Sequence, residues 1–427
     1  MLVLMNKNFL KEILVKQNSY FNRKKYSVVR EKLDLVKRYK DLPHIVIISG
    51  LRRVGKSTLL KQINDYFYNS QKYRYLNFED EKLLDFDVKE FNKLYEVFLE
   101  LNENSKVFLF DEIQNLEKWE IAIRRLYEEW LKFYITWSNS KLLSKELWTK
   151  LTGRYVKVEL FPFSFKEFLD FKWMKFEKND IYLSEVKAKI LKNFNKYLEI
   201  GWMPEYVKYE NEEILKQVYD DIIYKDIIVR YKISDVKTFK ELAKYLISNI
   251  WKPISYTKLK NMLWLWSVNT IKAYIEYLQN SYLIYELQKY DYSVRKQLVN
   301  HKKIYSIDLW FVNLLWFNFS ENIGRNLENL VFIELKRRWK QLYYHKNKKE
   351  CDFVIVEWLK PVEVIQVTYS LEGEETRKKE IDWILEAMKD YGLKEWLILT
   401  YDEEDEIVPG DGLKIKVLPI WRWMMEK

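Results

Sequence analysis

The sequence is poor in cysteine, histidine and glycine and has no long apolar run, and each shortage excludes a class of protein. The single cysteine, Cys351, excludes an internal disulfide framework and a cysteine-rich zinc site. Three scattered histidines argue against a histidine-based metal cluster. No apolar stretch reaches the roughly 18 residues that a membrane span needs, and residues 1–10 are too interrupted for a secretory signal. We therefore expect a protein of the reducing cytoplasm with no membrane partner.

Length and charge set the broad class. The chain has 427 residues, which predicts about two to four domains of ordinary size. Hydrophobic residues make up 48% and charged residues 32%, which is typical of a folded chain. The 73 Lys and Arg residues exceed the 63 Asp and Glu residues. The resulting formal charge of +10 suits DNA as a partner, and it suits a merely solvated surface equally well.

Tryptophan and glycine occur in inverted proportion. The chain has 17 Trp against 9 Gly, although glycine normally supplies about 7% of residues. Several tryptophans stand where a turn favours glycine, among them Trp202, Trp264 and Trp266. One interpretation is an aromatic-rich protein. The other is that the source organism reads many of these codons as glycine, as a reassigned stop codon would cause.

Short β-rich segments alternate with helical segments over residues 41–160, after a basic helical lead-in over residues 1–40. Continuous apolar strands between helices are typical of a parallel sheet covered on both faces, so we expect an α/β fold. The expected strands are Ile45–Ser49, Tyr73–Phe78, Val107–Phe110, Tyr134–Thr136 and Tyr155–Leu160.

The segment GLRRVGKST follows the first of these strands and precedes a helical segment. In this context it predicts a phosphate loop, because glycines allow close approach and the helix N-terminus directs N–H groups at phosphates. Lys56 would reach the β- and γ-phosphates of ATP, and Ser57 would ligate Mg²⁺. The predicted nucleotide-binding residues are Gly50, Gly55, Lys56, Ser57 and Thr58.

Two acids follow the strand over Val107–Phe110. Asp111 and Glu112 would lie at the carboxyl edge of the sheet, where α/β folds bind ligands. Asp111 can hold Mg²⁺ and Glu112 can polarise an attacking water, so the pair predicts ATP hydrolysis rather than binding alone. A solvated acidic pair at a strand end is the alternative.

Two further residues are predicted to act in hydrolysis. The strand over Tyr134–Thr136 leads to Asn139, which would sense the γ-phosphate and orient the water. Arg154 would act as an arginine finger on a neighbouring subunit, which makes a homo-oligomer a candidate assembly. The alternatives are an ordinary turn residue and a surface arginine.

Three regions follow. Residues 161–232 are helical and would form a lid or connector, and residues 320–427 form a second α/β unit. Residues 233–310 predict a winged helix-turn-helix, a module that binds either DNA or proteins. Its expected helices cover Phe239–Asn249, start at Ser255 and cover Ser267–Asn280.

The motifs resemble those of the AAA+ ATPases that are widespread in archaea and occur in some bacteria. The resemblance covers nearly the whole chain, and it implies an AAA+ P-loop core over residues 41–160, a winged helix and a nuclease-like domain. In that family glycine is typical at the positions of Trp137, Trp202 and Trp310. The resemblance rests on ISGLRRVGKSTLL, VFLFDEIQN, SNSKLLS, LTGRYVKVELFPFSFKEF, YLEIGWMPEYV and KDIIVRY.

The last unit resembles the PD-(D/E)XK nucleases, in which clustered acids hold Mg²⁺ and a lysine aids attack on a phosphodiester. The resemblance implies that Glu328, on a helix, and Asp352, at the start of a strand, are metal ligands. Where the pattern has an acid and a lysine, this sequence has Gln366 and Thr368. The departure removes a strong ligand and the catalytic lysine, which favours a degenerate, structural or DNA-docking domain over an active nuclease.

The sequence therefore predicts a cytoplasmic, ATP-hydrolysing AAA+ switch or motor that uses ATP and Mg²⁺ and acts on or near DNA. One alternative is an ATP-dependent, Mg²⁺-requiring DNA nuclease with Glu328, Asp352 and Gln366 around its metal. The other is a nucleotide-gated protein-interaction scaffold that does not touch DNA.

Overall fold

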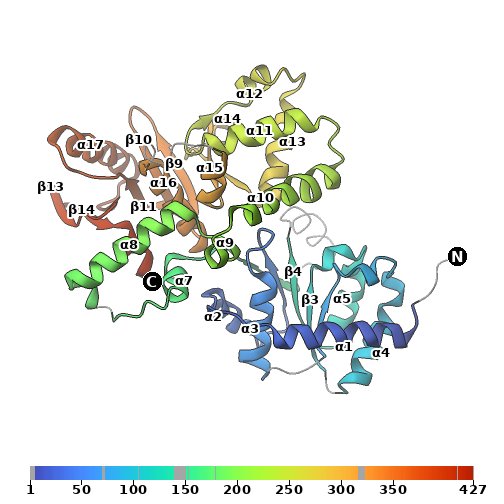
Figure 1. Ribbon diagram of the computed structural model, residues 1–427. Coiled ribbons are helices and arrows are strands. Elements are labelled where there is room, and N and C mark those ends of the chain that lie inside the picture. Colours follow the sequence, from blue (N-terminus) through green and yellow to red (C-terminus); the bar gives the residue numbers. More distant parts are fainter. Residues whose placement is uncertain are drawn as a thin grey trace. The chain divides into compact units, whose positions relative to one another are not determined.

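A computed structural model divides the chain into two compact units, residues 1–161 and 162–427. Figure 1 shows the helices and strands of both units. The described residues are 5–69, 73–103, 105–138, 151, 153–177, 179–315, 323–410 and 412–426.

A parallel five-stranded sheet forms the centre of the first unit, in the order β2-β3-β4-β1-β5. This confirms the expected parallel α/β core, in which β1, β3 and β4 are buried along their whole length, as is typical of a parallel sheet. Because β4 lies between β1 and β3, residues at its carboxyl end stand between the phosphate loop and the acid pair. The strands are β1 (Ile45–Ser49), β2 (Tyr75–Asn77), β3 (Val107–Asp111), β4 (Lys132–Trp137) and β5 (Tyr155–Glu159).

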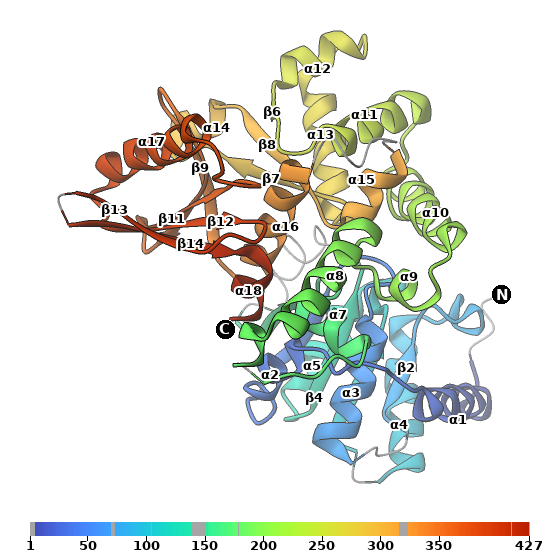
Figure 2. The ribbon, with the colours of Figure 1, turned by 60° about the vertical axis from the view of Figure 1, so that its left-hand side comes forward.

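The N-terminal helix belongs to the same core as this sheet. Asn6 caps α1 by accepting from the N–H of Phe9, and the apolar side of α1 places Leu10, Ile13 and Leu14 in the core. Figure 2 shows α1 beside α4 and near β2, the strand at the edge of the sheet. The helices are α1 (Lys7–Arg23), α2 (Lys32–Lys37), α3 (Lys56–Tyr68), α4 (Phe91–Leu101) and α5 (Trp119–Tyr127), with short 3-10 turns at Glu81–Leu83, Val88–Glu90 and Ile113–Asn115.

The second unit begins with helices. A capping box starts the first of them, because the Ser164 side chain accepts from the N–H of Glu167 while the Glu167 side chain accepts from the N–H of Ser164. The elements are α7 (Phe165–Phe171), a 3-10 turn at Asp180–Tyr182, α8 (Ser184–Ile200), α9 (Pro204–Tyr209), α10 (Glu212–Asp221) and a π-helical segment at Ile222–Val229.

A helical group with a small antiparallel sheet follows. Asp235, Ser255 and Ser267 cap its three main helices through their side chains, which explains why these helices start within three residues of their expected positions. The small sheet has the order β6-β8-β7. The elements are α11 (Val236–Ser248), β6 (Pro253–Ile254), α12 (Tyr256–Met262), α13 (Val268–Asn280), β7 (Ile284–Gln288), α14 (Val294–Val299), β8 (Lys302–Ser306) and α15 (Leu309–Leu315).

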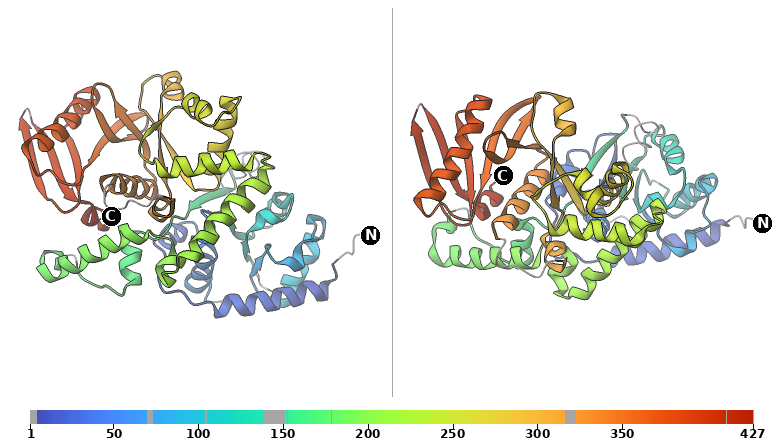
Figure 3. Two further views of the ribbon diagram at one scale, coloured as in Figure 1. Left: turned by 45° about the horizontal axis from the view of Figure 1, so that its top comes forward. Right: turned by 90° about the horizontal axis from the view of Figure 1, so that it is seen from above.

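A mixed six-stranded sheet ends the chain, in the order β13-β14-β12-β11-β10-β9 (Figure 3). Phe353 of β10 meets Phe332 of α16, whereas Val354 packs in a core with Ile384 of α17. Successive strand residues face opposite ways, so the two helices cover opposite faces. The elements are α16 (Ile323–Arg337), β9 (Gln341–Lys346), β10 (Glu350–Glu357), β11 (Lys360–Val367), α17 (Glu374–Tyr391), β12 (Glu395–Thr400), β13 (Asp405–Gly410), β14 (Leu413–Pro419) and α18 (Ile420–Met425).

Candidate active site

The loop from Gly50 to Gly55 turns sharply between β1 and α3. Gly50 has φ +154°, and a Cβ atom there would lie 2.3 Å from the carbonyl oxygen of Leu160. Gly55 has φ +100°, in the left-handed region that favours glycine. The first N–H groups of a helix have no helical acceptors, so those of α3 are available to an anion in this loop.

The Lys56 side chain folds back over the loop. It is almost fully buried, and its ammonium donates to the carbonyl oxygens of Gly50 and Leu51, both at 3.2 Å. The same Nζ lies 3.4 Å from Glu112 Oε1, beyond the end of β3. One ion pair therefore joins the loop to the acid pair at the carboxyl edge of the sheet.

Three hydroxyl groups surround the buried carboxylate of Asp111. Tyr75 Oη donates to Oδ2 at 2.8 Å, Thr136 Oγ1 donates to Oδ1, and Ser57 also hydrogen-bonds the carboxylate. Burial raises the pKa of Asp111 and the charge of Glu112 raises it further, while the hydroxyl groups offset part of the rise. The Ser57 hydroxyl and the Asp111 carboxylate together offer the oxygen ligands that Mg²⁺ prefers.

Glu112 has a positive φ of 49°, an uncommon conformation for glutamate. Its Oε2 accepts from Ser138 Oγ at 2.9 Å and from Gln114 Nε2, and its backbone N–H donates to Thr136 Oγ1 at 2.8 Å. Burial raises the pKa of Glu112, but the charge of Lys56 and the bonds from Gln114 and Ser138 outweigh burial and lower it. The carboxylate is therefore charged at neutral pH.

The contacts of the acid pair include Tyr75, Gln114, Thr136 and Ser138, none of which the sequence singled out as site residues. A signal existed for Thr136 and Ser138, because they end β4, which lies beside β3. Polar side chains at the same edge of neighbouring parallel strands meet. Tyr75 and Gln114 gave no such signal, since their contacts depend on the strand order and on the turn after β3.

Of the other two residues predicted for hydrolysis, the structure describes Arg154 alone. Asn139 lies outside the described residues. Arg154 precedes β5, and its carbonyl accepts from the N–H of Ile45 at the start of β1. The phosphate loop follows the far end of that strand, about 13 to 16 Å away at the usual rise per residue. The Arg154 guanidinium pairs with Glu128 at 3.0 Å, and its role on a neighbouring subunit stays a prediction.

The second unit buries the three nuclease-like residues together. Glu328 of α16 and Asp352 of β10 face the ammonium of Lys303, at 3.0 and 3.5 Å. Gln366 of β11 accepts from the N–H of Asp352 through Oε1 at 3.3 Å and donates through Nε2 to Glu380 at 2.9 Å. The residues that the resemblance implied therefore meet, but around a lysine that the sequence did not suggest.

Lys303 stands on β8 with its side chain 1% exposed. Its ammonium also lies 2.8 Å from Glu350 Oε1. Burial lowers the pKa of Lys303, but the charges of Glu328, Asp352 and Glu350 outweigh burial and raise it. No pattern in the sequence indicated this contact, because a lysine on a short strand is normally directed to solvent.

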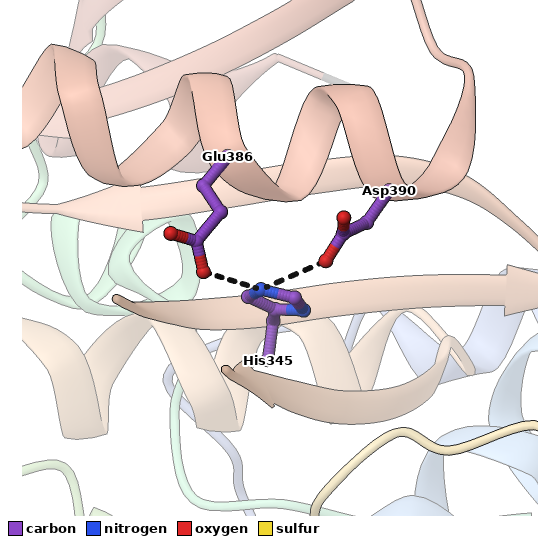
Figure 4. Close-up of side chains that lie close together, drawn as sticks. All are labelled: His345, Glu386 and Asp390. Carbon is purple, nitrogen blue, oxygen red and sulfur yellow. Dashed lines mark ion pairs between the residues drawn. The ribbon is translucent and has the colours of Figure 1, made fainter. Parts of the chain in front are cut away.

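A third group of ionisable side chains joins β9 to α17. Figure 4 shows Glu386 and Asp390 directed from α17 toward His345, whose Nε2 lies 3.7 Å from each carboxylate. The three could share a metal ion, but the same oxygens already accept from the N–H of Lys348 at 3.0 Å and from Asn347 Nδ2 at 2.7 Å. Burial lowers the pKa of His345, so the ring is neutral at neutral pH. These hydrogen bonds hold the turn after β9 against α17.

Comparison with known proteins agrees with the geometry of the first unit. The profile of a family described as an AAA domain matches residues 42–169. A second profile, described as a domain of unknown function, matches residues 191–320. The parallel sheet, the glycine loop and the family match together place the first unit in the class of P-loop AAA+ proteins.

Two relatives extend over nearly the whole chain. An uncharacterized protein of Methanocaldococcus jannaschii is 37% identical over 423 residues, which cover 94% of this chain and 92% of the relative. An uncharacterized protein of Haemophilus influenzae is 32% identical over 404 residues, which cover 91% of this chain and 96% of the relative. The chain belongs to the family that contains these archaeal and bacterial proteins.

Solved structures give a weaker likeness. The Aeropyrum pernix ORC1 protein in complex with DNA is 12% identical, and the match covers 70% of this chain and 96% of that chain with a TM-score of 0.31. Thermotoga maritima RuvB is 18% identical, and the match covers 62% and 93% with a TM-score of 0.28. The AAA+ class therefore rests on the family match and the loop geometry. No helix in the described part of the chain is long and apolar enough to cross a membrane.

Proposed function

We propose that the chain is an ATP-hydrolysing AAA+ switch or motor. One observation supports the proposal most strongly. Lys56, Asp111 and Glu112 lie together at one edge of the parallel sheet, beside a loop in which Gly50 and Gly55 have positive φ. A phosphate-binding loop next to an acid that can hold Mg²⁺ and an acid that can position the water is the arrangement that nucleotide hydrolysis uses.

ATP would bind with its phosphates in the loop. The N–H groups at the start of α3 and the ammonium of Lys56 would hold the β- and γ-phosphates. Ser57 and Asp111 fit Mg²⁺, because their hydroxyl and carboxylate groups already lie within hydrogen-bond reach of each other. Mg²⁺ bound there neutralises negative charge on the phosphates.

Glu112 would act on the attacking water. Its charged carboxylate accepts the water's proton as the water oxygen bonds to the γ-phosphorus, and the bond from that phosphorus to the β–γ bridging oxygen breaks to leave ADP and phosphate. Ser138 and Gln114 hold the carboxylate in place. The predicted roles of Asn139, as sensor, and of Arg154, as finger in a homo-oligomer, complete the proposal.

The ion pair between Lys56 and Glu112 gives the switch a physical basis. The ammonium is shared between Glu112 and two loop carbonyls. Phosphates would draw the ammonium toward themselves, which would release Glu112 to meet the water. The hydroxyl groups of Thr136 and Ser138 would then carry the change from the acid pair to β4.

Hydrolysis and binding assays on matched variants test this proposal. We expect Lys56→Ala to weaken nucleotide binding about 10²-fold, and Glu112→Gln to bind ATP but hydrolyse it about 10²–10³-fold more slowly. Glu81→Gln, an exposed glutamate of the same unit, is the control and should retain full turnover. Ordinary turnover in Lys56→Ala or Glu112→Gln would overturn the site assignment.

DNA is proposed as the partner of the second unit. The order α11, β6, α12, α13, β7 and β8 supports a winged helix-turn-helix, and α14 between β7 and β8 exposes Arg295 and Lys296, which could contact phosphates. The six-stranded sheet would be a degenerate nuclease-like domain with a structural or DNA-docking role.

Duplex binding at two salt concentrations tests the DNA partner. The double variant Arg295→Ala/Lys296→Ala should bind more weakly and with a shallower salt dependence than the wild-type chain. The exposed pair Lys189→Ala/Lys192→Ala on α8 is the matched control. Absent or salt-insensitive binding by the wild-type chain would instead favour a protein-interaction scaffold.

A further inference from the structure

The acid cluster of the second unit has the oxygens of a metal site but a different cation among them. The cluster consists of Glu328, Glu350 and Asp352 around Lys303, with Gln366 beside Asp352. The nuclease resemblance implies Mg²⁺ here. Such an ion could bind only through oxygens that are not already hydrogen-bonded to other donors.

The ammonium of Lys303 already uses the inward oxygens. It lies 3.0 Å from Glu328 Oε1, 2.8 Å from Glu350 Oε1 and 3.5 Å from Asp352 Oδ1. An ammonium has three N–H donors, so three carboxylates match its capacity. Glu328 Oε1 accepts in addition from Tyr305 Oη at 2.7 Å.

Glu350 Oε2 accepts from Lys346 Nζ at 2.7 Å, and two further oxygens of the cluster accept from main-chain N–H groups. Asp352 Oδ2 accepts from the N–H of Val367 at 3.0 Å, and Gln366 Oε1 accepts from the N–H of Asp352 at 3.3 Å. Mg²⁺ demands near-octahedral oxygen ligands at about 2.0–2.1 Å. The residues as they stand do not fit such an ion, because the oxygens named above already accept from Lys303, Tyr305, Lys346 and main-chain donors.

Lys303 belongs to the small three-stranded sheet and not to the six-stranded sheet. Lys303 lies in β8, where it pairs with Leu287 of β7 and Pro253 of β6. Its side chain therefore enters the cluster from the small sheet, and the ion pairs join that sheet to α16 and β10 within the second unit. Removing a lysine that is this buried would leave its acid partners without a compensating charge, which is strongly unfavourable.

We propose that the Lys303 ammonium is the resident cation of this cluster, in the place of a divalent ion, and that the six-stranded sheet is metal-independent and does not cut nucleic acid. The inference rests on the proposed degenerate role of this sheet. It is independent of ATP hydrolysis by the first unit, which is measured separately.

Mn²⁺ binding by the nucleotide-free chain tests the proposal, with Asp111→Asn in every sample so that the nucleotide site holds no metal. Lys303→Gln should gain a Mn²⁺ site, visible by electron paramagnetic resonance and calorimetry, and added Asp352→Asn should abolish it. The chain that keeps Lys303 should show no Mn²⁺ binding that Asp352→Asn changes.

Two results would overturn the proposal: a Mn²⁺ site that depends on Asp352 while Lys303 is present, or a folded Lys303→Gln chain that gains no site. Should Lys303→Gln not fold alone, the comparison of Asp352→Asn with its parent decides, since it needs no change at Lys303. Mg²⁺-dependent DNA cleavage that Asp352→Ala abolishes would likewise establish the nuclease alternative.

A separate observation concerns tryptophan. Among the described residues fifteen other than glycine have positive φ, and six of these are tryptophan, although tryptophan supplies 17 of 427 residues. Positive φ is disfavoured for bulky side chains and suits glycine. The six are Trp130, Trp173, Trp251, Trp264, Trp339 and Trp358.

Three of these residues end helices in the same way, Trp173 after α7, Trp264 after α12 and Trp339 after α16. In each case the tryptophan N–H bonds the carbonyl three residues earlier, and the next N–H bonds the carbonyl five residues earlier. This is the Schellman motif, whose left-handed residue is usually glycine. After α17 the chain itself has Gly392 in the left-handed conformation.

Packing does not compensate for the strain. Trp173 is 78% exposed, Trp264 is 91% exposed and Trp358 is 95% exposed. Trp358 and Leu359 form the two-residue turn between β10 and β11, both with positive φ, and such turns favour Gly and Asn. We infer that glycine occupies these six positions in the protein that the source organism makes.

Peptide mapping by mass spectrometry of the natively produced protein tests this inference. We expect glycine at the six positions and tryptophan at the buried control Trp421, whose Nε1 donates to Asp402 at 3.1 Å. Tryptophan in the peptides that span the six positions would overturn the inference.

Discussion

Each unit buries a lysine against acids, and the two lysines are placed for opposite purposes. Lys56 faces one carboxylate at 3.4 Å and two loop carbonyls, in a loop whose glycines leave room for a ligand. Lys303 faces three carboxylates and comes from a strand that is itself paired on both sides. The Lys56 ammonium can therefore move to another anion, whereas the Lys303 ammonium is already matched by three carboxylates.

The comparison teaches that residue type and burial alone do not separate a working site from a closed one. What separates them is the charge of the partners, since Lys56 faces one carboxylate and Lys303 faces three, and whether glycine geometry keeps space open beside the lysine.

Replacing Lys303 should have the largest effect. Lys303→Met leaves the buried Glu328 and Asp352 and the half-buried Glu350 without their cation, and breaking a buried ion pair in this way costs about 3–5 kcal/mol. Unfolding followed through hydrogen exchange at β10 would measure the loss. Lys346→Met, which removes an exposed partner of Glu350, should cost less than about 1 kcal/mol. Equal losses in the two variants would contradict a closed cluster held by Lys303.

Replacing Lys56 should affect ligand binding rather than folding. The ammonium would make charge-assisted hydrogen bonds to phosphates, so Lys56→Ala should weaken ATP binding by about 10²-fold, roughly 2.7 kcal/mol. Calorimetric titration with ATP and Mg²⁺ would measure it. The melting temperature without nucleotide should change little, and a large drop there would assign Lys56 the structural role of Lys303.

Removing the Ser138 hydroxyl should affect turnover alone. Ser138 holds Glu112 by one hydrogen bond at 2.9 Å, and loss of a bond to a charged group costs about 1.5 kcal/mol, or roughly tenfold in kcat. ATP titration of hydrolysis rates would show the fall in kcat with an unchanged KM. A rise in KM alone would instead place Ser138 in nucleotide binding.

His345 should give a small pH dependence of stability. Burial lowers the pKa of His345 in the folded chain, so the unfolded chain binds the proton more readily. Stability attributable to His345 should therefore be lost as pH falls from about 6.5, the unfolded pKa, toward the lower folded value. Melting temperatures of the wild-type chain and of His345→Gln at pH 7.5 and pH 5.5 would isolate the contribution of His345. An identical pH dependence in the two chains would contradict this prediction.

The local features of the first unit could be predicted from the sequence because they are encoded in neighbouring residues. The glycine loop and the acid pair follow apolar strands, and the fold places both at one edge of the sheet. The contacts of Tyr75 and Gln114 could not be predicted, since they depend on which strands are neighbours. Ser138 lay next to the predicted Asn139, so the prediction reached the right segment.

The contacts of the second unit could be predicted from the sequence only in part. Glu328, Asp352 and Gln366 meet as the nuclease resemblance implied, because each stands on an expected helix or strand. Lys303 lies 25 residues before Glu328 on a strand of another sheet, and no local pattern links the two. Strands β13 and β14 were also missed, because their polar residues alternate with apolar ones only over short stretches.

The most direct test of the ATPase assignment is a comparison of steady-state ATP hydrolysis by the wild-type chain and by Glu112→Gln, with and without duplex DNA. We expect the wild-type chain to hydrolyse ATP and the Glu112→Gln chain to bind ATP without hydrolysing it. A faster wild-type rate with DNA would support the DNA partner, and an indifferent rate would favour a protein-facing switch. Equal hydrolysis by the two chains would contradict the assignment of Glu112 and of the site built around it.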